Sequence, residues 1–114
     1  MIMTETRKRI YDFRLGLIAD IATILIRNFV DVLEAKEISS STPVIIVDED
    51  DADFTYTLDR ISWGGGGTSD IYIDCSNCCH NKTIALESLD IDVLGDILDW
   101  LNDNEETITE VYSI

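Results

Sequence analysis

Residues 11–33 read YDFRLGLIADIATILIRNFVDVL and contain the most apolar stretch of the chain, residues 15–33. From residue 10 to residue 32, apolar residues recur at helical spacings in two series. The first series is Tyr11, Leu15, Ile18, Ala22, Leu25, Phe29 and Val32. The second series is Ile10, Leu17, Ile21 and Ile24. The series predict one helix over about 6–36, with Thr4 or Thr6 as its cap. Because this apolar arc is wider than the usual buried stripe, we expect cover on more than one side, from a second helix or from another copy of the chain.

Three charged residues, Asp20, Arg27 and Asp31, interrupt the same stretch. A membrane-spanning helix needs about 20 nearly uncharged residues, so we expect no transmembrane segment, and the N-terminus shows no signal-peptide pattern. The chain has 114 residues, of which 46% are hydrophobic and 27% charged. These proportions are typical of one globular domain, here residues 1–114.

A turn-rich segment at 39–43 ends the helical region, and it contains Pro43, the only proline. Beyond it, the apolar patterns predict four strands, over about 44–47, 53–63, 69–75 and 82–87. In the second of these, the apolar residues before and after 59–60 fall in opposite phases, which predicts a β-bulge there. Short connections favour an antiparallel meander.

The last clear element is a helix over about 90–103, in which Leu94, Ile97, Leu98 and Leu101 repeat at helical spacing behind a possible cap at Asp90. Residues 107–114 are either a fifth strand or a frayed end. The sequence thus predicts an α+β fold: a long N-terminal helix, a four-stranded antiparallel meander and a C-terminal helix, with both helices on one face of the sheet.

Charge is distributed unevenly along the chain. Eight basic and 23 acidic residues give a net charge of −15. Residues 1–40 carry six of each and sum to zero, whereas residues 41–114 carry two bases against 17 acids. An anionic surface of this kind argues against direct binding to nucleic acid or to an anionic membrane. The acidic part serves solubility, or it is an interaction surface.

Two acidic groups are candidates for binding a partner. One is the run between the first two strands: Asp48, Glu49, Asp50, Asp51 and Asp53. It is not an EF-hand, because aspartates stand where that loop needs a glycine and a glutamate. The other recurs at intervals of four, three and four on one face of the last helix: Asp92, Asp96, Asp99 and Asp103. Such like charges cost a few tenths of a kcal/mol per pair, which favours a basic partner; a solvated face is the alternative.

Three cysteines, Cys75, Cys78 and Cys79, lie within five residues and do not form a disulfide framework, so we expect a reducing, cytoplasmic location. Cys75, Cys78 and His80 are candidate zinc ligands. Outside residues 75–80 the chain has no other cysteine or histidine to complete the site. Alternatively, Cys75 is a small buried residue in phase with the apolar side of its strand.

The run Gly64–Gly67 sits between two strands and does not fit a phosphate-binding loop, which leads into a helix; we expect a hairpin turn. Trp63, just before it, either closes the edge of the core or contacts a partner. The chain has one histidine, His80, and no recognisable nucleophile–base pair, so we expect no enzymatic activity.

Residues 83–98, TIALESLDIDVLGDIL, resemble a pattern in short acidic proteins from phages and mobile elements of gut bacteria. In those proteins a last strand leads through a Leu-Ser/Asp-x-Asp-x-Leu turn into a closing helix. The group has no agreed activity, so the resemblance implies only a bacterial or phage accessory protein.

We therefore expect a non-enzymatic acidic interaction module without a cofactor, homodimeric through its first helix. Its partner would be a basic protein, such as a nucleic-acid-binding protein or a toxin being neutralised, or a second copy of itself. The alternative is a small zinc-binding protein that uses Cys75, Cys78 and His80.

Overall fold

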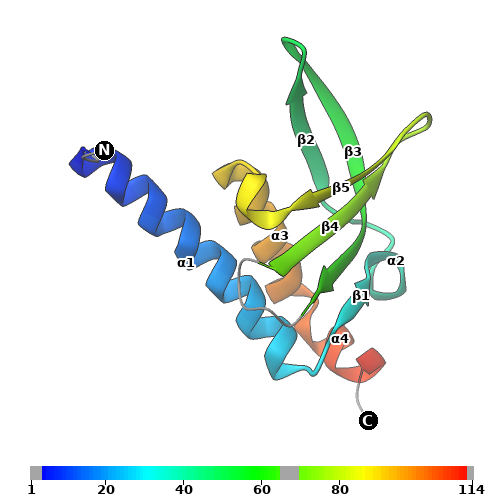
Figure 1. Ribbon diagram of the computed structural model, residues 1–114. Helices are drawn as coiled ribbons and strands as arrows, with labels where there is room; N and C mark the ends of the chain where they lie inside the picture. The colour runs from blue at the N-terminus through cyan, green and yellow to red at the C-terminus, as the bar shows by residue number, and fades with distance from the viewer. Residues whose placement is uncertain (1–3, 65–69, 113–114) are drawn as a thin grey trace.

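The computed structural model describes residues 4–64 and 70–112 and confirms an α+β architecture (Figure 1). An N-terminal helix precedes an antiparallel sheet of five strands, and two further helices follow the sheet. The elements in chain order are α1 (Glu5–Arg27), β1 (Val32–Glu34), α2 (Ala35–Ile38), β2 (Val44–Glu49), β3 (Ala52–Trp63), β4 (Ile71–Ser76), β5 (Asn81–Ala85), the 3₁₀ turn η2 (Leu86–Ser88), α3 (Ile91–Asp103) and α4 (Glu105–Tyr112).

The first helix starts where the sequence predicts but ends nine residues early, at Arg27 instead of Lys36. At its start, the Thr4 hydroxyl accepts a hydrogen bond from the Arg7 backbone N–H. None of the helices in the described ranges is long and apolar enough to cross a membrane.

A Schellman motif ends α1. The N–H of Phe29 donates to the carbonyl of Ile26, at 3.1 Å, and the N–H of Val30 donates to the carbonyl of Leu25, at 2.9 Å. Val30 and Leu25 are both buried, which supplies the apolar contact of this motif. Its left-handed position is normally glycine, but Phe29 occupies it here, with φ of 57°. This motif redirects the chain, so Phe29 and Val32 are not helical as predicted.

Residues 32–34 instead form β1, a strand that the sequence analysis missed. β1 pairs antiparallel with β3, and Leu33 lies opposite Ile61. Both side chains are fully buried. Burial of Leu33 against the sheet therefore outweighs continuation of the helical pattern.

β1 and β2 follow one another along the same edge of β3, since both pair with it on the side away from β4. The short helix α2 and the serine-rich segment after it separate them. β4 and β5 continue the sheet on the other side of β3. The four predicted strands are present as β2 to β5, although the predicted start of β4 at Ser69 lies outside the described residues, as does all of the predicted glycine turn except Gly64.

The predicted bulge is confirmed, because the register of β3 against β4 shifts between Leu58 and Arg60. This shift brings Leu58 and Ile61 to the same buried side of the sheet. The turn in Figure 1 between β2 and β3 is a two-residue hairpin, with Asp50 and Asp51 both at positive φ.

After the sheet, α3 matches the predicted helix, although the side chain of Asp90 makes no capping hydrogen bond. The chain from Glu105 to Tyr112 is a helix, α4, and not the strand or frayed end that we expected. Ile108 explains this, since it is fully buried and the elements around α4 give its apolar side a place to pack.

One cluster of buried side chains joins the helices to the sheet. α1 and α3 lie next to each other, and each contributes five buried residues. Alternate residues of the strands complete the cluster, and the residues between them, such as Val44, Ile46 and Tyr72, are exposed. The sheet thus has one buried side and one open side.

Two hydrogen bonds attach the C-terminal helices to the interrupted edge of the sheet. The indole N–H of Trp100 donates to the carbonyl of Ser41, at 2.9 Å. The backbone N–H of Glu34 donates to the hydroxyl of Tyr112, at 2.8 Å. Burial raises the pKa of Tyr112 above its ordinary value. Trp100 and Tyr112 therefore hold the segment that departs from the sheet between β1 and β2.

We expect Phe29→Gly to stabilise the protein by up to about 1 kcal/mol. Glycine removes left-handed strain of roughly 1–2 kcal/mol, and its greater freedom in the unfolded chain offsets part of that gain. Little packing is lost, because Phe29 is 81% exposed. Urea unfolding followed by circular dichroism measures the change. A lower free energy of unfolding in the variant would show that the ring contributes more than its exposure indicates.

Candidate interaction surface

The carboxylates of Asp92, Asp96, Asp99 and Asp103 are exposed on one side of α3. The opposite side is buried, through Val93, Leu94, Ile97 and Leu101. Successive aspartates stand three or four residues apart, so they are neighbours along the helix surface. We call these four residues the acidic stripe.

The acidic stripe lacks internal counter-ions. Within residues 4–64 and 70–112, none of its carboxylates forms a salt bridge. Five acids elsewhere form salt bridges: Glu5 with Arg9, Glu105 with Arg27, Glu34 and Asp74 with Arg60, and Glu49 with Lys82. Among the described residues, the negative charge of the stripe is therefore not compensated by a salt bridge.

The second acidic group lies at the tip of the β2–β3 hairpin. Asp48 and Asp53 are directly opposite each other across the two strands, which is unfavourable for two like charges. Asp50 and Asp51 form the turn, and Glu49 pairs with Lys82 of β5. Four of the five carboxylates are therefore exposed at the tip, whereas Glu49 has an internal partner.

A hollow connects the start of this hairpin run to α3. Asp48 and Asp90 both line it, together with Val47, Ile84 and Leu89 among others, and its volume is about 180 Å³. Asp90 directly precedes α3 and stands two residues before Asp92, the first residue of the acidic stripe. The two acidic groups predicted from the sequence are thus linked at this point, although the rest of the hairpin tip extends away from the helices (Figure 1).

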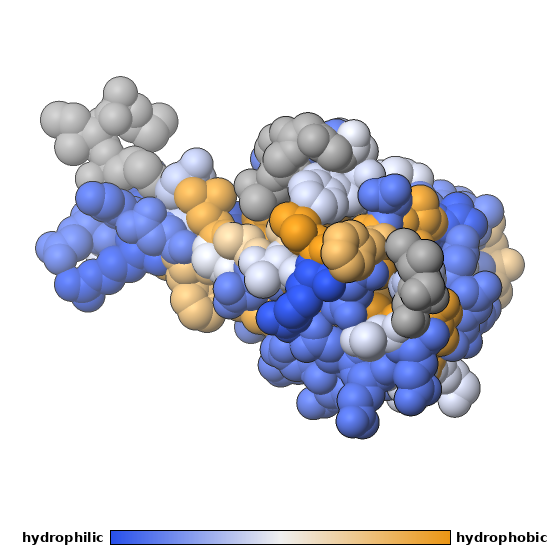
Figure 2. Space-filling view, turned by 90° about the horizontal axis from the view of Figure 1, so that it is seen from below, coloured by the Kyte–Doolittle hydropathy of each residue, from blue (hydrophilic) through white to orange (hydrophobic). Residues whose placement is uncertain are grey.

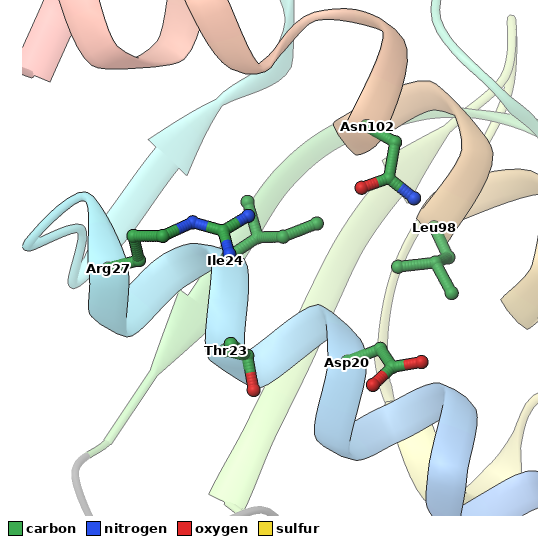
Figure 3. Close-up of a pocket in the computed structure, with 6 residues that line it drawn as sticks. All are labelled: Asp20, Thr23, Ile24, Arg27, Leu98 and Asn102. Atoms are coloured by element: carbon green, nitrogen blue, oxygen red, sulfur yellow. The ribbon is translucent and has the colours of Figure 1, made fainter.

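A second hollow, of about 210 Å³, lies between α1 and α3. In Figure 3, Asp20, Thr23 and Arg27 follow one another along α1, and Leu98 and Asn102 lie across from them on α3. The space is smaller than ordinary small-molecule pockets, which start at roughly 300 Å³. We therefore assign no ligand to it and treat Asp20 as a further acidic group near α3.

A polar cluster that the sequence analysis did not identify joins the end of α1 to α4. The guanidinium of Arg27 makes two hydrogen bonds to the carboxylate of Glu105, at 2.6 and 2.7 Å. Asn28 is buried, donates to Glu105 at 3.0 Å, and accepts from the hydroxyl of Thr109 at 2.6 Å. The hydrogen bond from Arg27, followed by that from Asn28, holds the pKa of Glu105 below its ordinary value.

The predicted zinc ligands have different surroundings. Cys75 is buried on the inner side of β4, and burial, followed by the charges of Asp59 and Asp74, raises the pKa of its thiol to about 11. Cys78 and His80 are exposed beyond the end of the strand. In the described part of the chain, no three His, Cys, Asp or Glu side chains are grouped so as to hold a metal ion. Zinc binding stays a prediction.

Cys78 and Cys79 lie side by side in the β4–β5 hairpin, and their Sγ atoms are 3.1 Å apart. The hydrogen bond with Cys78 is the main cause that raises the pKa of Cys79. The side-chain oxygen of Asn77 accepts from the backbone N–H groups of Cys79 and His80, which shapes the loop.

Trp63 is partly buried and packs against the core. Its backbone N–H donates to the carbonyl of Asp31, at 2.8 Å. With Ile26, Phe29 and Val30 it also lines an apolar hollow of about 370 Å³ at the end of α1. Trp63 lies at the edge of the core and beside an exposed apolar surface. This position is compatible with both roles considered from the sequence, which are closing the edge of the core and contacting a partner.

Comparison of the chain with protein-family models, curated proteins and solved structures gives no match.

We expect Glu105→Gln to reduce stability at pH 7 and to flatten the decline of stability in acid. The pKa of Glu105 is lower in the folded state than in the unfolded state. The ionised carboxylate therefore stabilises the fold above its unfolded pKa, about 4.3, and this contribution is lost as the pH falls through the folded value. Urea midpoints of both proteins between pH 7 and pH 3 measure the effect. A constant difference across this range would contradict it.

We also expect two of the three thiols to react rapidly with a disulfide reagent such as Ellman's reagent at pH 8. Cys78 and Cys79 are exposed, whereas Cys75 is buried and has a raised pKa. Cys75 should react only in denaturant. Cys75→Ser should leave the rapid phase at two thiols, and Cys78→Ser should reduce it to one. Rapid reaction of all three thiols in the native protein would contradict the buried position of Cys75.

Proposed function

We propose that the protein is a non-enzymatic acidic interaction module that binds a basic protein through the acidic stripe. The observation that carries this proposal is the alignment of four exposed carboxylates on α3 without an internal counter-ion in the described residues. Asp90 and Asp48 extend the same surface toward the β2–β3 hairpin. We take α1 and α3 to share one face of the sheet, which puts the acidic stripe on the outermost layer.

Repulsion within the stripe supports a binding role over simple solvation. Like charges three or four residues apart on a helix destabilise it by a few tenths of a kcal/mol per pair. Solubility needs net charge but does not need that charge to be aligned. Lysine or arginine side chains of a partner would relieve this repulsion when they dock.

The single row of negative charges, although less dense than the phosphates of DNA, supports a partner that ordinarily binds a phosphate backbone. Asp92 and Asp103 are 11 residues apart, which corresponds to about 16 Å along the helix axis. Four charges over this length give roughly 5 Å per charge, against 3.4 Å per phosphate along one DNA strand. We therefore propose a nucleic-acid-binding protein, or a basic toxin that is neutralised, as the partner.

We expect replacement of all four stripe residues, Asp92→Asn/Asp96→Asn/Asp99→Asn/Asp103→Asn, to weaken binding to a basic ligand at least tenfold. The probe is a ten-residue lysine peptide, measured by isothermal titration calorimetry at low and at moderate salt. The affinity of the parent protein should fall as salt rises, because salt screens exposed charges.

The matched control is Asp31→Asn/Glu37→Gln/Glu106→Gln/Glu110→Gln. These four carboxylates are exposed, and none of them forms a salt bridge within the described residues. Both variants change the net charge by the same amount, from −15 to −15 + 4 = −11. An equal loss of affinity in both would show that only the total charge matters and would reject the stripe as a site. Circular dichroism verifies that both variants fold.

A further inference from the structure

The N-terminal part of α1 extends beyond the rest of the molecule (Figure 1). All residues from Thr4 to Phe13 are exposed, and Ile18 is the first buried residue of the helix. We call residues 4–15 the arm. Seen from below in Figure 2, hydrophobic atoms lie where the protruding end joins the body, and hydrophilic atoms cover its far end.

The arm presents the same helix face that the body buries. Ile18, Ala22 and Leu25 are buried, and the same series continues into the arm as Leu15, 43% exposed, and Tyr11, 50% exposed. The second series behaves alike, since Ile21 and Ile24 are buried but Ile10 is 48% exposed. The apolar surface of α1 is therefore continuous, but this chain covers only its C-terminal half. An exposed apolar surface that continues a core is typical of a protein interface.

Charge identifies the partner that fits the arm. The arm carries four bases, Arg7, Lys8, Arg9 and Arg14, and two acids, Glu5 and Asp12, so its net charge is +2. The remainder of the chain carries −15 − 2 = −17. A cationic arm is thus the complement of the body from which it protrudes, and a second copy of the chain offers that body.

The body is acidic at the place where the arm leaves it. The guanidinium of Arg14 donates hydrogen bonds to the backbone carbonyls of Leu89 and Glu87, the latter at 3.4 Å. These bonds attach the C-terminal end of the arm to the segment before α3. Glu87 and Asp90 are exposed beside this contact. They are therefore close to the apolar face that a second helix would cover.

We propose that two copies of this chain form a symmetric dimer in which their arms pair antiparallel through this apolar face. If the arms cross near Tyr11, Arg7 and Lys8 of one copy lie opposite Leu15 and Arg14 of the other, because each residue advances about 1.5 Å along the helix. That position is beside Glu87 and Asp90. The Arg14 guanidinium is bound to backbone carbonyls there, so the carboxylates of Glu87 and Asp90 are the groups that Arg7 and Lys8 would meet. One twofold axis then covers both apolar faces and pairs both sets of charges. The dimer does not depend on the proposed function of the acidic stripe.

Tyr11→Glu tests the apolar contact and has a matched control in Ile26→Glu. The two side chains are on the same helix and are equally exposed, 50% and 52%, but Ile26 lies outside the arm. In sedimentation equilibrium at micromolar concentration, the parent protein and Ile26→Glu should be dimers, and Tyr11→Glu should dissociate at least tenfold more readily. A monomeric parent protein at 100 μM, or dissociation of Ile26→Glu to the same extent as Tyr11→Glu, overturns the proposal.

A charge exchange distinguishes self-association from the binding of an acidic foreign protein. Arg7→Glu/Lys8→Glu should weaken the dimer at least tenfold, and so should Glu87→Lys/Asp90→Lys. The variant with all four changes should recover most of the parent's association. In it, the acidic arm of one copy meets lysines at positions 87 and 90 of the other copy. Lack of recovery in a folded protein, judged by circular dichroism, overturns the proposed register and partner. The acidic-stripe variant should dimerise like the parent, which separates a failure here from a failure of the proposed function.

Discussion

α1 has to stop at Arg27 for the sheet to form as it does, because the next residues supply its first strand. The chain reverses at Asn28 and Phe29, and only then does Leu33 enter the core beside Ile61. The Schellman motif makes the reversal, and Glu105 secures it from the far end of the chain by binding both Arg27 and Asn28. A strained phenylalanine at the turn is tolerated because so many buried contacts depend on this geometry.

The protein also has regions of different charge. Three bases of the body, Arg27, Arg60 and Lys82, each bind a carboxylate. Arg7, Lys8 and Arg9 are exposed on the arm, Arg14 is bound to the segment before α3, and the carboxylates of the acidic stripe are exposed. A cationic apolar arm and an anionic helix face are therefore separate surfaces with different chemical complements. We propose that the first binds a second copy of the chain and that the second binds a basic protein.

Local patterns predicted the parts of the fold that local forces decide. A short apolar run located β2, alternating apolar residues located β3 to β5, and a change of phase located the bulge after Leu58. The early end of α1 was missed because Phe29 and Val32 continue the helical series, and neither glycine nor proline marks the reversal. α4 was missed because its Thr, Ile, Val and Tyr residues favour a strand, and only packing around Ile108 makes the segment helical. The aspartates of the acidic stripe could be placed on one helix face in advance, since helical spacing alone puts them there.

The amino-acid sequence by itself determined the α+β class, the wide apolar face of the first helix and the surplus of acid after residue 40. Each of these follows from composition or from the period of a single element. Tertiary structure alone decided which half of that apolar face is covered, which acids meet a base, and where Cys75 lies relative to Cys78 and His80. Those outcomes depend on contacts between residues far apart in the chain, such as Arg27 with Glu105, and the spacing of neighbours carries no information about them.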